Sequence, residues 1–214
     1  MSPTASWQCQ ARPGDWHGAA LRLFAAMFAG PLDEAAVKSY RSGQGAEILR
    51  ALAAEPALRA GIEQMQIALR ELPQGNAGTA ELARAHVVLF SGAGGPASVS
   101  PYESAFTEPT GRLFGASEAA MQALLAAHDL SVAAPGNEPA DHIATELALL
   151  AELYDRSPSA DRSALRDRLI GWLPAFRNAC RRCDRSGFYA GAATAAAGLL
   201  QALSGPQPAI GGIA

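Results

Sequence analysis

Glycine and proline divide this chain into short segments, and nearly every segment spaces its apolar residues as a helix does. The apolar positions of the first segment are Leu21, Phe24, Ala25 and Phe28. Residues three and four apart share one face of a helix. No run alternates apolar and polar residues as a half-buried strand would, and the nearest candidate, residues 87–90, lies at the end of a helical segment. Because the helix formers Ala, Leu and Arg are also abundant, the sequence predicts an all-α fold.

The predicted helices form one domain. They cover residues 15–29, 33–39, 46–54, 57–72, 79–90, 117–128, 138–154, 161–172, 174–182 and 186–203. Asp15 is the expected cap of the first helix, and Pro174 begins a new one because proline interrupts the hydrogen-bond ladder. With 214 residues the chain can build a substantial core. We assign residues 1–204 to a single helical bundle, and expect the Gly- and Pro-containing tail, 205–214, to be disordered.

Charge and composition exclude several classes of function. The formal net charge of −3 does not suit a nucleic-acid-binding protein, which needs a basic face. We find neither a signal peptide nor a segment long enough to cross a membrane. The three cysteines, an odd number, favour a reducing compartment. These features predict a cytoplasmic protein without membrane insertion.

Residues 91–109 form the longest irregular segment and are rich in Gly, Ser and Pro. A loop of this length in a compact domain is usually functional or mobile. It holds the run Pro101-Tyr102-Glu103-Ser104-Ala105-Phe106, whose large aromatic side chains must either dock on the core or line a groove. The loop could also be a hinge for domain swapping, so a monomer and a domain-swapped homodimer both remain open.

Residues 138–154 are predicted to form a helix whose first turn is acidic. Asn137 or Glu138 would cap it, and Pro139 is tolerated in the first turn. The expected buried stripe is Ile143, Leu147, Leu150 and Tyr154. The opposite face would carry Glu138, Asp141, His142, Thr145, Glu146 and Leu149. An ordinary acidic turn on a solvated face is the alternative interpretation.

Two motifs in this region resemble the TorD/DmsD family of redox-enzyme maturation chaperones. One is Leu89-Phe90-Ser91-Gly92 followed, after a Gly/Pro linker, by the run from Pro101 to Phe106. The other is Glu138-Pro139-Ala140-Asp141-His142 followed by Glu146-Leu147-Ala148-Leu149-Leu150. Their order and spacing are similar to those of the family, whereas the His-rich motif of the related NarJ branch is absent.

The resemblance implies a non-enzymatic protein without cofactor. Such chaperones bind the twin-arginine signal peptide and the apo form of an exported molybdoenzyme until its cofactor is inserted. Carboxylates match guanidinium groups bidentately, and an aromatic groove suits the apolar run of the leader. The expected contacts are Pro101, Tyr102, Glu103, Ser104, Phe106, Glu138, Asp141 and His142. The arginine contacts of Glu103 and Glu138 are inferred from charge, and the others follow from the motifs.

Other chemistry is less well supported by the sequence. Cys180 and Cys183 form a lone C-x-x-C, and His142 with Glu146 has the spacing of a metal pair, but further ligands are missing. Ser104 lacks the surroundings of a catalytic nucleophile, and the glycines at 92–95 lack those of a phosphate loop. Two alternatives remain. One is a helical thiol-redox or metal-binding enzyme built on Cys180, Cys183 and His142. The other is an adaptor that binds a mature partner without recognising a leader (signal) peptide.

Overall fold

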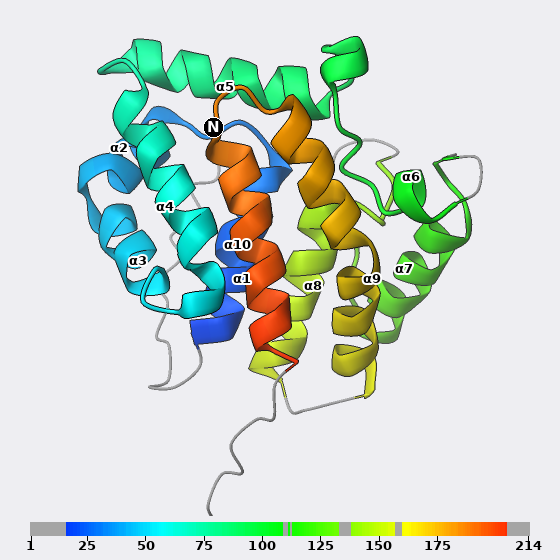
Figure 1. The fold of residues 1–214 in the computed structure, drawn as a ribbon. Coiled ribbons are helices and arrows are strands. Elements are labelled where there is room, and N and C mark those ends of the chain that lie inside the picture. Colours follow the sequence, from blue (N-terminus) through cyan, green and yellow to red (C-terminus); the bar gives the residue numbers. More distant parts are fainter. Residues whose placement is uncertain (1–15, 109–110, 112, 133–137, 157–159, 205–214) are drawn as a thin grey trace, which may run out of the picture.

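The computed structural model describes residues 16–108, 111, 113–132, 138–156 and 160–204, and it confirms the all-α prediction (Figure 1). The helices are α1 (Trp16–Ala29), α2 (Glu34–Ser42), α3 (Gln44–Leu52), α4 (Pro56–Glu71), α5 (Asn76–Phe90), the 3-10 turn η1 (Gly95–Ala97), α6 (Ser104–Thr107), α7 (Ala116–Ala127), α8 (Ile143–Asp155), α9 (Ala160–Cys183) and α10 (Phe188–Ala202). In these residues the β-pairing is limited to one antiparallel bridge, between Tyr102 and His142. Among the same residues, no helix is both long and apolar enough to cross a membrane.

Helix α10 lies in the centre of the bundle and packs closely on α4. A Cβ atom added at Gly198 would lie 1.9 Å from the carbonyl oxygen of Ala57, and one at Gly61 would lie 2.4 Å from the backbone nitrogen of Ala195. No larger residue fits these positions without moving the backbone. The small residues at these positions therefore bring the two helices into backbone contact.

An aromatic cluster connects the central helices. Phe28 of α1 and Phe90 of α5 both pack on Phe176 of α9, with ring centroids 5.5 and 6.0 Å away. Trp172, one turn earlier on α9, is 1% exposed and stacks on Phe106 of α6 at 5.6 Å. The core thus extends from α1 to the short helix α6.

Several predicted helix boundaries were wrong. Helix α8 begins at Ile143 rather than at residue 138, and His142 caps it by accepting the backbone N–H of Ala144 at 3.1 Å. Helix α9 continues through Pro174. Its buried residues lie on both sides of the proline, so tertiary packing outweighs the loss of one backbone hydrogen bond. The predicted cap Asp15 and the tail 205–214 lie outside the described residues.

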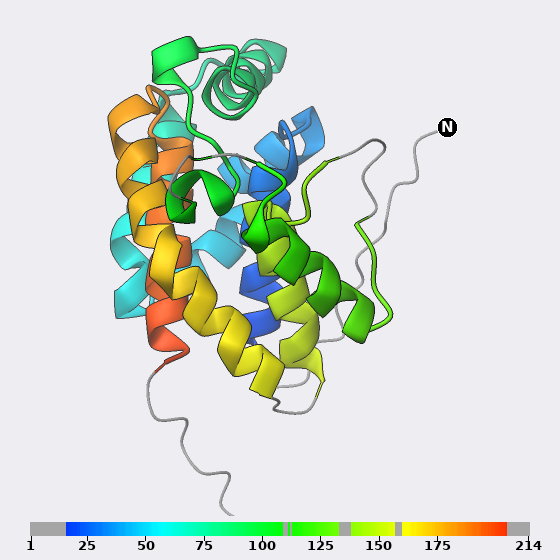
Figure 2. The same ribbon diagram turned by 90° about the vertical axis from the view of Figure 1, so that its right-hand side faces the viewer.

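The face predicted to lie opposite the buried stripe was also wrong at four of its six positions. Asp141 and Glu146 are fully buried, and His142 and Leu149 are 8% and 3% exposed. Helix α8 packs on α1 and also on α9, so it has two covered faces instead of one. Figures 1 and 2 show α8 between these helices, with α6 and α7 at one side of the bundle and α2, α3 and α4 at the other. The surface formed by α6 and α7 is therefore separate from the surface formed by α2, α3 and α4.

Candidate functional site

The two sequence motifs meet in space, although about forty residues separate them. The backbone N–H of Ile143 donates to the carbonyl oxygen of Pro101 at 2.8 Å, and that of Glu103 donates to the carbonyl oxygen of Asp141 at 3.0 Å. These bonds form the short antiparallel bridge between Tyr102 and His142. Residues 101–103 and 141–143 therefore form one unit.

Asp141 lies in the interior of this unit. Its side chain is fully buried, and its Oδ2 atom accepts the backbone N–H of Ser104 at 2.9 Å, at the first residue of α6. The second oxygen, Oδ1, and the hydroxyl of Ser104 are buried without a hydrogen-bond partner among the described residues. Asp141 thus fixes the start of α6 in the conformation described here.

Glu103 is also buried, and its partner is an arginine of α9. Arg168 Nε donates to Glu103 Oε2 at 2.6 Å, and the guanidinium also donates to the carbonyl oxygen of Ser117 at the start of α7. Glu103 is 6% exposed. A buried carboxylate is stable only with such a partner. This pair ties the loop motif to α7 and α9.

Glu146 of α8 lies beside this ion pair. Its Oε2 atom accepts the indole N–H of Trp172 at 3.1 Å, and its carboxyl group is within hydrogen-bonding reach of Glu103. Burial raises the pKa of Glu146 well above its ordinary value, and the negative charge of Glu103 raises it further, while Arg168 opposes the shift. Its Oε1 atom finds no donor among the described residues. A protonated Glu146 can instead donate to Glu103, and we assign it this neutral state near pH 7.

This assignment predicts how stability depends on pH. The folded state holds a proton on Glu146 that the unfolded state releases above its ordinary pKa, so this group stabilises the fold fully below that value and progressively less as pH rises. In Glu146→Gln an uncharged amide replaces the acid, so residue 146 no longer makes the stability depend on pH. Each pH unit between the unfolded and folded pKa values corresponds to about 1.4 kcal/mol. Urea denaturation at pH 5.5 and pH 8 should show that the free energy of unfolding of the variant, relative to that of the wild-type protein, is larger at the higher pH. A constant difference between the two proteins would contradict the assignment.

The outer side of the unit carries the accessible polar groups. The hydroxyl of Tyr102 donates to Glu138 Oε1 at 3.1 Å, and the Tyr102 ring meets the His142 ring edge to face at 5.1 Å. Burial and the neighbouring Glu138 raise the pKa of Tyr102 to about 12. Burial lowers the pKa of His142, against an opposing effect of Glu138, so the ring is neutral at pH 7. Glu138 itself has a side chain that is 43% exposed.

A cleft of about 310 Å³ lies next to Glu138, between α7 and the segment that leads to α8. Its carboxylates are Glu118 and Glu138, and its apolar wall includes Leu125, Leu130 and Val132. Of these residues, only Glu138 belongs to one of the two sequence motifs. An acidic residue in the first turn of a helix, as Glu118 is in α7, is too common to indicate a site. The cleft offers negative charge beside apolar surface.

The comparisons with known proteins agree with this architecture. Residues 53–180 match the family described as nitrate reductase delta subunit. A chaperone protein TorD of Ferrimonas balearica is 35% identical over 171 residues, which cover 78% of this chain and 78% of the relative. The chain belongs to the TorD family. Another TorD chaperone, of Vibrio cholerae serotype O1, is 30% identical over 187 residues, covering 82% of this chain and 84% of the relative.

A solved structure shares the fold. It is described as a redox enzyme maturation protein of Archaeoglobus fulgidus, with a TM-score of 0.56 and 22% sequence identity, and the alignment covers 91% of this chain and 99% of that one. The family resemblance drawn from the two motifs is therefore confirmed. The chain is a maturation chaperone and not an enzyme.

The thiol and metal alternatives gain no support from the geometry. Cys180 is fully buried, and burial raises its pKa, which makes the thiol a poor nucleophile. Within the described part of the chain, His, Cys, Asp and Glu residues form no group of three or more that could hold a metal ion. The third cysteine, Cys9, lies outside that part.

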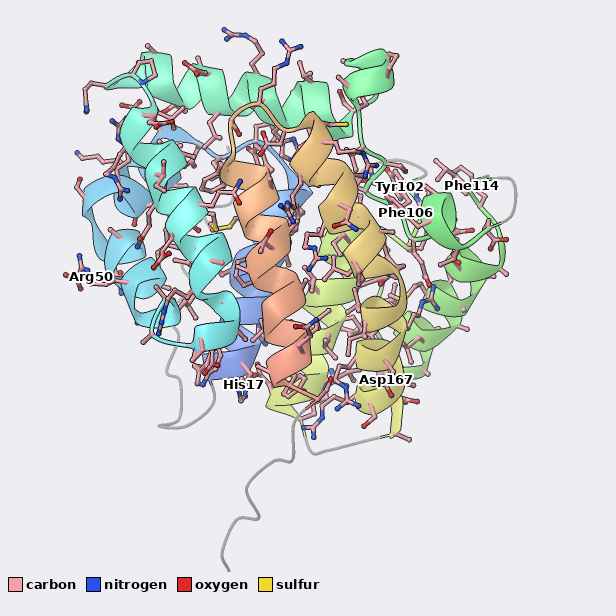
Figure 3. The ribbon with its side chains drawn as sticks, in the orientation of Figure 1. His17, Arg50, Tyr102, Phe106, Phe114 and Asp167 are labelled. Carbon is pink, nitrogen blue, oxygen red and sulfur yellow. The ribbon has the colours of Figure 1, made fainter. Side chains whose placement is uncertain are left out.

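The structure divides the predicted binding residues into two sets. Those buried in the unit are Pro101, Glu103, Ser104, Asp141 and His142. Phe106 is half-buried against Trp172, and Tyr102, also half-buried, lies near it in Figure 3. Glu138, which accepts the hydroxyl of Tyr102, is exposed. All of them come from the two motifs and lie around one junction. Their contact with a peptide remains a prediction.

Proposed function

We propose that this chaperone binds the twin-arginine signal peptide of an exported molybdoenzyme, together with the apo form of that enzyme, until the cofactor has been inserted. Membership of the TorD family supports the maturation role. The observation that carries the choice of ligand is the cleft beside Glu138, which combines two carboxylates with an apolar wall. A twin-arginine leader offers the complementary pair, two guanidinium groups next to an apolar run.

In this proposal the leader arginines contact Glu118 and Glu138. Carboxylates bind guanidinium groups through paired hydrogen bonds. The apolar run of the leader packs on Leu125, Leu130 and Val132, which adds the hydrophobic part of the affinity. Glu103 and Asp141 then act indirectly, since both already bind groups of the chaperone itself. Their role is to hold the junction that positions Glu138.

A leader titration tests the proposal. A fluorescent twin-arginine leader peptide should bind saturably, and Glu118→Gln/Glu138→Gln should weaken binding about tenfold, because two charge-assisted contacts of up to ~1 kcal/mol each are lost. The matched control is Glu81→Gln, which removes an exposed carboxylate of α5 far from the cleft and should leave the affinity unchanged. A twin-lysine leader should bind more weakly to the wild-type protein.

Two outcomes would contradict this assignment. Equal affinity of the double variant and the wild-type protein would move the arginine contacts away from the cleft. Absence of binding to leaders of several molybdoenzyme classes would contradict leader recognition itself. The chaperone would then act as an adaptor for a partner without a leader.

A further inference from the structure

A second cleft lies on the other side of the molecule, between α2, α3 and α4, and it is cationic. Its volume is about 530 Å³. One arginine from each of the three helices lines it: Arg41, Arg50 and Arg70. Among the described residues that line it there is no carboxylate. Figure 3 shows Arg50 at the edge of the bundle opposite Tyr102, Phe106 and Phe114.

Two of these arginines are available to a ligand. Arg41 is held in place, because its guanidinium donates to the carbonyl oxygens of Leu72 and Pro73 at 3.0 and 2.6 Å. Arg50 and Arg70 are exposed and form no hydrogen bond or ion pair with any described residue. In contrast, Arg156 and Arg168 each pair with a carboxylate. Two unpaired arginines therefore lie at this cleft, although the net charge of the chain is negative.

We propose that this cleft binds an acidic segment of a protein partner, one that also carries apolar side chains. The charge of the cleft excludes a twin-arginine leader, so this surface is separate from the one proposed above and does not depend on it. Recognition of acidic motifs by grouped arginines is an established mode of peptide binding. The amides of Gln66 and Gln74 add donors for backbone or side-chain oxygens.

The size of each contribution favours a segment over a small anion. An exposed guanidinium–carboxylate pair contributes about 0.2–1 kcal/mol, so the two available arginines give ~2 kcal/mol at most. A dissociation constant of 1 mM already requires about 4 kcal/mol. The remainder can come from apolar contact with the half-buried ring of Tyr40 in the cleft and with Ile67, which follows Gln66 on α4 and is 48% exposed. A ligand therefore needs carboxylates and apolar groups together.

Fluorescence anisotropy with a labelled peptide of alternating glutamate and leucine tests the proposal on the full chain. We expect saturable binding that weakens as salt is added. In Arg50→Gln/Arg70→Gln the affinity should fall about tenfold, since two exposed pairs are lost. Both arginines are exposed, so the variant should keep the circular dichroism spectrum and the thermal midpoint of the wild-type protein.

Matched controls separate this site from general attraction to positive charge. Arg181→Gln/Arg182→Gln removes two exposed arginines at the end of α9 and should leave peptide binding unchanged. A peptide with glutamine in place of glutamate should not bind. Equal loss in both double variants would overturn the proposal, because binding would then follow net charge alone. Displacement of the peptide by equimolar pyrophosphate would also overturn it, because the cleft would then be a site for small anions. The twin-arginine leader should bind both double variants as it binds the wild-type protein.

Discussion

Replacing Arg168 by alanine is expected to lower the free energy of unfolding by about 3–5 kcal/mol. The guanidinium reaches from α9 to Glu103 and to the carbonyl oxygen of Ser117, so it joins three segments of the site. Without it, the carboxylate of Glu103 stays buried, 6% exposed, beside Glu146 and without a cation. An uncompensated buried charge costs several kcal/mol, which far exceeds the loss of an ordinary surface contact.

Urea denaturation of matched variants measures this effect. Arg156→Ala is the control, because its pair with Glu152 is exposed and spaced i, i+4, and its loss should cost less than about 1 kcal/mol. In Glu103→Gln/Arg168→Ala the buried charge is absent, and most of the lost stability should return. If Arg168→Ala were no more destabilising than Arg156→Ala, the pair with Glu103 would not support the fold.

The sequence predicted most of the helices because apolar spacing and breakers act locally. The predicted helix of residues 57–72 and the observed α4, Pro56–Glu71, differ by a single residue at each end. The start of α8 could not be found in this way. Residues 141–143 pair with a loop about forty positions earlier, and this pairing holds His142 in an extended conformation where local signals favour a helical turn. Pro174 is the opposite case, since packing on both sides keeps a helix intact where proline predicts a break.

The two motifs lie far apart in the sequence and meet in the fold, but they did not predict the position of each side chain. Their types, carboxylates and aromatics, suggested contacts with a cationic peptide. The fold instead uses Glu103 and Asp141 to bind its own backbone and Arg168. The cleft residues Glu118, Leu125 and Leu130 carry no motif, because a single helix face gives no sign of which neighbour it meets. Only the packing of α7 against residues 130–132 and 138–140 brings them to Glu138.

Asp141→Ala should lower the free energy of unfolding by about 3 kcal/mol. The side chain is fully buried and accepts the backbone N–H of Ser104, so its removal leaves that donor unpaired and opens a cavity. Asp141→Asn is the matched variant, because its amide oxygen can accept the same N–H, and it should lose about 1 kcal/mol. Thermal and urea denaturation of both variants measure these differences. If both variants lost the same free energy of unfolding, the hydrogen bond to Ser104 would not be the interaction through which Asp141 stabilises the fold.

The same asparagine variant distinguishes the two roles open to Asp141. If Asp141 holds the junction, Asp141→Asn should bind a twin-arginine leader as the wild-type protein does, whereas Glu138→Gln should bind it more weakly. If Asp141 contacts an arginine directly, as its motif predicts, loss of its charge should weaken leader binding more than loss of Glu138 does. Direct contact would require the junction to open, since Asp141 has no exposed surface in the conformation described here. Hydrogen exchange at the backbone amide of Ser104 would then increase when the leader binds, because that amide would lose its acceptor.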